Sequence, residues 1–380
     1  MGKRFLLVAM DMGNTPPGVV FKTLAKALAA YASLEVICPD FDETFGWEGI
    51  SRIPAPPYHV HRWKTIRRYW KWLCCNPDDS LWARRAMRAV MPALGQYDAV
   101  ISLTSMNYFP SILLGRKIAA KLGKPWWIYS VDGIPSPTEW LDGDALTHDR
   151  MALWLDRVCA GADGFFSSNP YMMDYQRRMM PHMKGRWDYL PTPHNLTSSC
   201  PFVPHEGLVF LYTGTLYGLR RIDGLLEGFR AFRKGHPQAK LVFVGDTHPS
   251  YKEQASAMAA EGAVEFLPFQ RDVNPLLERA DVLLDIGADI PDDVFLSSKI
   301  ISYLPMERPI LAITGKNSPA RNMLGGIPSI IHCSNDAAQV GEALERCVKA
   351  VGAGIGDRAG ARALFQASNV ARKLFETICL

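Results

Sequence analysis

The chain has 380 residues, of which 48% are hydrophobic and 21% charged. This length is sufficient for two hydrophobic cores of ordinary size, and the composition is that of a globular protein, neither disordered nor embedded in a membrane. The 42 Lys and Arg residues exceed the 38 Asp and Glu residues by only four, so the net charge does not indicate nucleic-acid binding.

The N-terminal apolar run is short. Residues 5–10 are too few for the core of a signal peptide, they lead into Asp11, and no run in the chain approaches 18 apolar residues. We therefore expect a cytoplasmic protein that meets a membrane only at its surface. The eight cysteines are scattered, with no Cys-x2-Cys pair and no cluster with His at metal-ligand spacing, so they are expected to be reduced packing residues.

Short apolar runs alternate with helical patterns along the whole chain, which is typical of parallel sheets built from strand-helix-strand units. In the first half we expect strands at 5–10, 34–37, 99–103, 126–131 and 164–167 and helices at 20–30, 81–94, 112–122, 151–159 and 171–180. In the second half we expect strands at 208–212, 240–244, 264–267, 282–285, 309–313 and 329–332. The sequence therefore predicts an α/β protein with two doubly wound, Rossmann-like domains.

A proline-rich stretch separates the two halves. Residues 190–204 contain four prolines, which cannot continue a helix or a central strand. We expect an N-terminal domain at 1–192, a linker at 193–206 and a second domain at 207–356. Residues 357–380 have helical periodicity with no strand after them, so they are expected to form a helix that packs on a finished surface. The glycines of 352–356 follow no strand and are expected to form a loop between helices.

The first chemistry-bearing loop is residues 212–223, where a strand breaks at Gly214 and Gly218 before a helix begins. Free backbone N–H groups at such a turn, with Arg220 and Arg221 as further donors, favour a bound phosphate. The alternative is a plain turn with solvated arginines.

The second loop leads into the helix that begins near Ser298. Ser297 or Ser298 can cap this helix, which leaves backbone N–H donors and Lys299 facing an anion. The alternative is an ordinary serine cap with an exposed lysine.

The third loop, residues 129–137, follows a strand and is rich in proline. Asp132 in this loop could orient a hydroxyl group or act in proton transfer. The alternative is that Asp132 only shapes the turn.

The second half also contains several blocks in the order of a known family: 214–216 with 220–223, 241–245, 264–269 before 276–282, and 298–299 with 308–312. These blocks resemble the donor-binding domain of the GT-B glycosyltransferases, close to glycosyltransferase family 4. The first half is similar more loosely, with its glycine loop at 10–18. The resemblance implies two Rossmann-like domains facing a cleft and a last helix that crosses back to the N-terminal domain.

The resemblance also implies roles for individual residues. The donor is expected to contact Gly214, Thr215, Arg220, Arg221, Phe269, Ser298, Lys299 and Ser302. The expected catalytic residues are Asp132, Arg220, Arg221 and Lys299, and Asn14 and Gly18 are expected on the acceptor side. The chain departs from the family pattern at three positions: Ser302 stands where many members have the glutamate that holds the ribose, Thr215 does not match the arginine that follows the turn glycine, and Asp132 stands where many members have histidine.

The implied activity is transfer of a sugar from a nucleoside diphosphate sugar, a UDP- or GDP-sugar, to a hydroxyl acceptor. The acceptor is expected to be a saccharide or a polyprenyl-linked glycan of a cell-surface polysaccharide, and family similarity implies retention of the anomeric configuration. We expect no metal cofactor, although Asp40-Phe-Asp42 and Asp142-Gly-Asp144 match the Asp-x-Asp pattern of the other glycosyltransferase fold. The alternatives are a non-catalytic protein that binds sugar nucleotides or glycans and a sugar-nucleotide epimerase.

Residues 59–73 combine basic and aromatic side chains. On a helix, Trp63, Ile66, Trp70 and Leu73 would share one face with Lys and Arg residues beside it, a pattern that favours an anionic membrane surface. Arg84, Arg85 and Arg88 extend the charge. The alternative is an ordinary helix that packs its tryptophan face on the first sheet.

Overall fold

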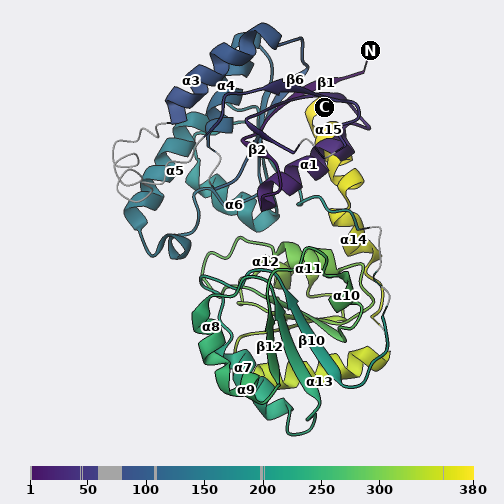
Figure 1. Cartoon of the computed structure of the whole chain (residues 1–380). Coiled ribbons are helices and arrows are strands. Elements are labelled where there is room, and N and C mark those ends of the chain that lie inside the picture. Colours follow the sequence, from purple (N-terminus) through teal and green to yellow (C-terminus); the bar gives the residue numbers. More distant parts are fainter. Residues whose placement is uncertain are drawn as a thin grey trace. The chain divides into compact units, whose positions relative to one another are not determined.

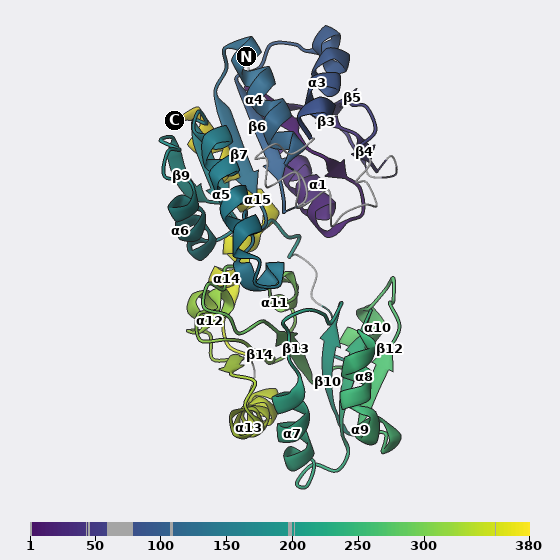
Figure 2. The same cartoon turned by 90° about the vertical axis from the view of Figure 1, so that its left-hand side faces the viewer.

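The computed structural model describes residues 2–42, 44, 46–58, 79–106, 109–196, 200, 202–353 and 355–380. The chain divides into two compact units: unit 1 is Met1–Asn195 with Leu364–Leu380, and unit 2 is Leu196–Ala363. Each unit is built on one main parallel sheet with helices packed against it (Figure 1; Figure 2). The expectation of two doubly wound, Rossmann-like sheets is confirmed.

Unit 1 contains a seven-stranded parallel sheet in the order β5-β3-β1-β6-β7-β8-β9. Its strands are β1 (Arg4–Val8), β3 (Ser33–Cys38), β5 (Ile50–Pro54), β6 (Ala99–Thr104), β7 (Trp126–Ser130), β8 (Gly164–Ser167) and β9 (Arg186–Tyr189). The short strands β2 (Asp11–Met12) and β4 (Asp40–Phe41) pair separately. The longer helices are α1 (Pro16–Leu28), α3 (Asp79–Val90), α4 (Pro110–Leu122), α5 (Ala145–Cys159), α6 (Pro170–Met179) and α15 (Ala367–Cys379).

Both faces of this sheet are buried. Successive side chains of β1 point to opposite faces, so Leu6 and Val8 join the core on the side of α3, α4 and α5, while Phe5 and Leu7 join the core that includes residues of α1 and α15. Burial on both faces explains why the central strands appear in the sequence as continuous apolar runs.

Unit 2 contains a six-stranded parallel sheet in the order β12-β11-β10-β13-β14-β15. The strands are β10 (Leu208–Thr213), β11 (Ala239–Val244), β12 (Val264–Leu267), β13 (Val282–Ile286), β14 (Ile310–Ile313) and β15 (Ile330–Cys333). The helices are α7 (Asp223–Phe232), α8 (Pro249–Gln254), α9 (Ser256–Ala260), α10 (Asn274–Leu277), α11 (Ser298–Tyr303), α12 (Pro319–Leu324) and α13 (Ala337–Ala353). From β10 the chain builds the sheet in one direction through β11 and β12, and then returns to the other side of β10 with β13. In such a sheet, ligands bind where the strand order reverses, beyond the carboxyl ends of the strands, which here are those of β10 and β13.

The C-terminal segment was expected to be one helix at 357–380, but it forms two helices. α14 (Ala359–Phe365) and α15 are separated at Gln366, which forms a parallel β-bridge with His194. The His194 N–H donates to the Phe365 oxygen, and the Ala367 N–H donates to the His194 oxygen. The apolar side of α15, including Val370, Ala371 and Leu374, is buried in the core of unit 1. Figure 1 shows α15 beside α1. The backbone exchange with His194 explains the break.

Arg358 precedes α14 and is only 3% exposed. Its guanidinium donates to the backbone oxygens of Met306 at 3.1 Å, Arg308 at 2.7 Å and Ser329 at 3.2 Å, and to the Ser329 hydroxyl at 3.0 Å. A further hydrogen bond joins it to the Tyr303 oxygen at 3.4 Å. Arg358 therefore connects the end of α11 to the segments before β14 and β15.

Several sequence predictions need correction. The two edge strands of unit 1, β5 and β9, were not expected, and most other element ends move by one to a few residues. The loop expected at 352–356 begins later, because α13 continues to Ala353. Residues 59–73 lie outside the described residues. Within the described part of the chain, no helix combines the length and apolar character needed to cross a membrane.

Candidate functional site

Two glycines with left-handed backbone end neighbouring strands of unit 2. Gly214 follows β10 with φ of 115°, and Gly245 follows β11 with φ of 125°. A Cβ atom at position 245 would lie 2.8 Å from the Gly214 oxygen, and one at position 214 would lie 2.6 Å from Cε of Lys299. Both positions therefore require glycine, for conformation and for space.

The start of α11 is joined to β13 through Ser297. This residue caps the helix by accepting a hydrogen bond from the Lys299 N–H at 3.3 Å, and its hydroxyl donates to Asp285 Oδ1 at 2.6 Å. Asp285 is 1% exposed and lies within β13. The buried carboxylate thus fixes the helix start, and with it the position of Lys299.

Two cations approach the glycine turn. Nζ of Lys299 lies 5.2 Å from the centre of the Tyr212 ring, and the Arg220 guanidinium lies 4.5 Å from the centre of the Tyr217 ring. Arg220 also donates to the Thr215 oxygen at 3.4 Å. The Gly214 and Leu216 N–H groups donate to the backbone oxygens of Val244 and Asp246. Because position 214 has no side chain, both cations can approach one anion beside the turn.

The charges at this turn act on one another. Burial lowers the pKa of Lys299 to about 8; Asp285 opposes this shift and Arg220 adds to it. Burial raises the pKa of Asp285, while Lys299, the Ser297 hydroxyl and Arg220 lower it. Lys299 is therefore a half-buried ammonium group that would be stabilised by a bound anion.

Tyr303 attaches α11 to the end of β10. Its hydroxyl lies 2.7 Å from the Thr213 hydroxyl and accepts a hydrogen bond from the Thr213 N–H at 3.2 Å. Thr213 directly precedes Gly214, so this pair holds the glycine turn against the helix that carries Lys299.

The other residues predicted to contact the donor differ in their exposure and hydrogen-bond partners. Arg221 is paired with Asp223 and its side chain is 74% exposed. The Ser302 hydroxyl donates to the Ser298 oxygen at 2.9 Å, which leaves its lone pairs able to accept. Phe269 is 72% exposed. The structure thus brings Gly214, Arg220 and Lys299 together, while Arg221 has a partner of its own.

Asp285, Tyr303 and Asp293 belong to this region but were not proposed as site residues. Asp285 could have been found from the sequence, because it is a carboxylate inside an otherwise apolar strand. Asp293 is buried and accepts a hydrogen bond from the Phe295 N–H at 3.2 Å. Burial raises the pKa of Asp293 to about 6, and Asp285 and Asp289 add to this shift.

In unit 1, Asp132 follows β7. Its Oδ2 accepts a hydrogen bond from the Met106 N–H at 3.3 Å, and its backbone oxygen accepts hydrogen bonds from Ser130 and Gln176. Burial raises the pKa of the Asp132 carboxyl, and the Met106 N–H opposes this shift. A carboxyl with a raised pKa can exchange protons closer to neutral pH than an ordinary aspartate.

The glycine loop of unit 1 surrounds two buried charged side chains, Asp11 and Lys22. Asn14 Oδ1 accepts a hydrogen bond from Nζ of Lys22 at 3.0 Å, and Lys22 is paired with Asp42 at 2.7 Å. A Cβ atom at Gly18 would lie 2.7 Å from Asp11 Oδ1. Asn14 is therefore tied to Lys22, and Gly18 allows α1 to approach Asp11.

The two Asp-x-Asp segments have local roles. The hydrogen bond from Lys22 is the main cause of the low pKa of Asp42, about 2. Asp144 caps α5 by accepting a hydrogen bond from the Thr147 N–H at 3.0 Å. Among the described residues, no group of three His, Cys, Asp or Glu side chains is placed to hold a metal ion.

Comparison with known proteins gives a family match within unit 2 and a fold match over the whole chain. Residues 207–350 match the family described as glycosyl transferases group 1. The structure of Anabaena HepE in complex with UDP-glucose is similar, with a TM-score of 0.67, 12% identity and 99% of each chain covered. A structure described as trehalose-6-phosphate from E. coli bound with UDP-2-fluoro glucose has a TM-score of 0.67, 11% identity and 99% of each chain covered.

A putative UDP-N-acetylglucosamine 2-epimerase from Listeria monocytogenes has a TM-score of 0.56 and 10% identity, with 100% of this chain and 96% of that chain covered. No curated protein matches the sequence. At these identities the structural likeness shows the fold, and the group 1 match adds the family of residues 207–350. Residues 207–350 of unit 2 therefore match the group 1 glycosyl transferases, and the chain has the GT-B fold of the similar structures.

Proposed function

We propose that the chain transfers a glycosyl unit from a nucleoside diphosphate sugar to a hydroxyl acceptor. The observation that carries this proposal is the convergence of Arg220 and Lys299 on the Gly214 turn, at the switch point of the unit 2 sheet. An anion with two phosphates could accept hydrogen bonds from both cations.

The chemistry follows from where charge develops. When the bond between the sugar C1 and the diphosphate oxygen breaks, negative charge grows on the leaving group, and donors fixed in advance stabilise it most effectively. Lys299 is fixed through Ser297 and Asp285, and Arg220 by its contact with Thr215. Arg221 contributes its positive charge from the pair with Asp223.

For the donor we propose a UDP- or GDP-sugar, held at the ribose by Ser302 and contacted by Phe269 and Ser298. Two structurally similar proteins are described with UDP-glucose or a fluorinated UDP-glucose bound, which supports the uridine series as the first to test. We further propose that the transfer retains the anomeric configuration.

For the acceptor we propose a saccharide or a polyprenyl-linked glycan used in cell-surface polysaccharide synthesis, with Asn14, Gly18 and Asp132 on the acceptor side. The raised pKa of Asp132 supports a role in handling the acceptor proton. The enzyme would act in the cytoplasm, at the inner face of the membrane, through residues 59–73.

The membrane proposal rests on the basic and aromatic residues of 59–73. Liposome flotation with and without anionic lipid tests it, and Trp63 and Trp70 changed to serine provide the matched variant. We expect flotation only with anionic lipid and only for the unchanged protein. Negligible flotation in both lipid mixtures would rule out membrane docking.

Two other functions share the diphosphate site: a sugar-nucleotide epimerase and a non-catalytic sugar-nucleotide-binding or glycan-binding protein. Product analysis separates them. A transferase releases nucleoside diphosphate mainly when an acceptor is present, an epimerase converts the donor sugar, and a binding protein does neither.

The decisive experiment is a thermal-shift panel of UDP, GDP, ADP, dTDP and their sugars. A ligand that binds the native state adds roughly 2.7 kcal/mol to the free energy of unfolding at ~100 times its dissociation constant. We expect stabilisation by UDP or GDP that is lost in Lys299→Met. The absence of stabilisation by any nucleotide would refute the donor assignment.

A further inference from the structure

A second cationic cavity lies at the edge of the unit 2 sheet, apart from the glycine turn. It has a volume of about 590 Å³, and its lining includes Arg321, Arg346, His332, Ile327, Pro328 and Ile330. The edge strand β15 supplies His332, and β14 separates β15 from β13, which carries Asp285. None of the lining residues belongs to the site proposed for the donor.

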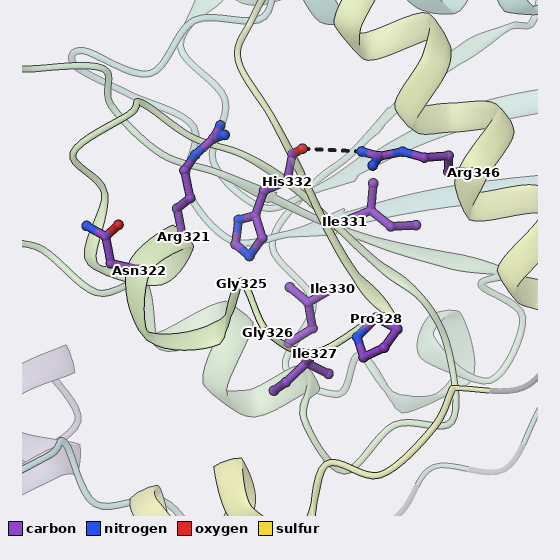
Figure 3. A pocket seen from close by; sticks show the side chains of 10 residues that line it. All are labelled: Arg321, Asn322, Gly325, Gly326, Ile327, Pro328, Ile330, Ile331, His332 and Arg346. Carbon is purple, nitrogen blue, oxygen red and sulfur yellow. Dashed lines mark hydrogen bonds between the residues drawn. The ribbon is translucent and has the colours of Figure 1, made fainter.

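Two arginines reach this cavity from different helices (Figure 3). Arg346 extends from α13 and donates to the backbone oxygen of His332 at 3.3 Å. Arg321 extends from α12 and donates to the Thr314 oxygen at 2.8 Å. Neither arginine forms an ion pair with a carboxylate of the described residues. The guanidinium groups therefore keep donors that protein carboxylates do not occupy.

Unsatisfied polar atoms surround the same place. Both ring nitrogens of His332, Nε of Arg321 and the Thr314 hydroxyl are buried without a hydrogen-bond partner. Figure 3 shows His332 between the two arginines. Buried polar groups normally have hydrogen-bond partners. Several buried polar atoms without a partner next to one cavity therefore indicate a ligand that supplies acceptors.

The walls limit what the ligand can be. Ile327, Pro328 and Ile330 give the cavity an apolar side, and Gly325 and Gly326 add no side-chain bulk. The volume falls within the range of pockets for small molecules, which is larger than a bare anion needs. The combination favours a molecule with one anionic group and a compact organic part.

We propose that this cavity binds a small phosphorylated molecule, with its phosphate between Arg321 and Arg346 and its organic part against Ile327, Pro328 and Ile330. Guanidinium groups match the geometry of phosphate oxygens, and two of them can hold one phosphate from two directions. Rotation of the His332 ring would present an N–H group as a third donor. This site is independent of the proposed donor function, because it uses none of the same residues.

The test measures binding of inorganic phosphate, glucose 6-phosphate and AMP by calorimetry, in a Lys299→Met background that weakens binding at the glycine turn. Arg321→Gln and Arg346→Gln each remove charge-assisted hydrogen bonds and should weaken binding roughly tenfold or more. Lys349→Gln is the matched control, because it removes the same charge from exposed α13 surface outside the cavity. The control should bind like its parent.

Two further measurements protect the test against a variant that fails to fold. Gly326→Leu leaves both arginines in place, and its added side chain starts in open space within the cavity lining, so it should block the organic ligands. Phosphate should also shift one histidine ring signal in the NMR spectrum, the signal that is absent from His332→Gln. Binding unaffected by both arginine substitutions, or no shift of the His332 signal with any of the three compounds, would overturn the proposal.

Discussion

Lys299 occupies the space beside Gly214 that a side chain at position 214 would fill. We therefore predict that Gly214→Ala weakens nucleoside diphosphate binding by roughly tenfold or more, because the methyl group displaces the ammonium group from the turn. Gly207→Ala is the control, since Gly207 also has a left-handed φ, 93°, but no cation beside it. Both substitutions should lower the free energy of unfolding by about 1–2 kcal/mol, whereas only Gly214→Ala should affect binding. Equal binding by the two variants would contradict the role of this contact.

The lowered pKa of Lys299 predicts a pH dependence of donor binding. The ammonium group is charged below a pKa of about 8 in the free protein, so affinity for UDP should fall as the pH rises through that value. Lys299→Arg should remove this fall, because arginine stays charged throughout the range. Calorimetry from neutral to alkaline pH measures both.

The stability of the protein should respond in the opposite direction. Between a pKa of about 8 in the folded protein and the ordinary lysine pKa of 10.5, the unfolded chain holds a proton at position 299 that the folded protein has released. The contribution of Lys299 to stability therefore rises with pH in this range. UDP binding and the contribution of Lys299 to stability should therefore change in opposite directions as the pH rises. If both fell together, global unfolding, and not titration of Lys299, would be the cause of the lost binding.

Ser297→Ala removes the cap of α11 and the hydroxyl that donates to Asp285. We predict a loss of about 1–2 kcal/mol in the free energy of unfolding, because a buried carboxylate loses a donor at the same time as the helix loses its cap. Ser302→Ala is the stability control on the same helix; Ser302 is exposed, and its removal should change stability by less than about 0.5 kcal/mol. Urea unfolding of both variants provides the comparison.

Arg358→Gln should be more damaging than either serine substitution. The buried guanidinium satisfies backbone oxygens of four residues, and glutamine reaches only some of them, so we expect a loss of roughly 2–4 kcal/mol. Arg362→Gln removes the same charge from the exposed side of α14 and should be nearly neutral. If the two variants have the same free energy of unfolding, the hydrogen bonds of Arg358 contribute little to stability.

Activity should persist in EDTA. The proposed reaction places the leaving-group charge beside Arg220 and Lys299, which stabilise it without a metal ion. Nucleoside diphosphate release, measured in EDTA and after addition of Mn²⁺, tests this expectation. Complete loss of activity in EDTA that Mn²⁺ restores would contradict it.

The sequence was most informative where strands are buried on both faces. β6 and β13 are buried along their whole length and mostly apolar, and both were predicted with small errors at their ends. The edge strand β5 escaped prediction because Ser51 and Arg52 are exposed and the strand ends in proline. The edge strand β9 is also only half-buried and contains polar residues. An edge strand packs against fewer neighbours than a central strand, so its sequence carries a weaker signal.

At the site, loop residues were easier to predict than the residues that support them. Gly214 follows β10 in a recognisable glycine turn, and Lys299 lies in the first turn of a helix with a serine cap. Asp285 and Tyr303, in contrast, act through hydrogen bonds to other elements. No local pattern shows that Tyr303 reaches Thr213, because that contact depends on how α11 packs on the sheet. The separation of Arg220 from Arg221 likewise required the structure, since the two are adjacent in the chain.

The exchange of backbone hydrogen bonds between His194 and the residues around Gln366 joins two separate stretches of the chain into unit 1, so unit 1 is not an uninterrupted piece of the gene. Unit 1 is completed by the last 17 residues, Leu364–Leu380, which are translated only after all of unit 2. The helix α15 can therefore cover the apolar surface beside α1 only after all of unit 2 has been synthesised. Loss of the codons for α15 would impair the first unit while leaving the sheet of the second intact. A gene for unit 1 alone would have to join residue 195 to residue 364.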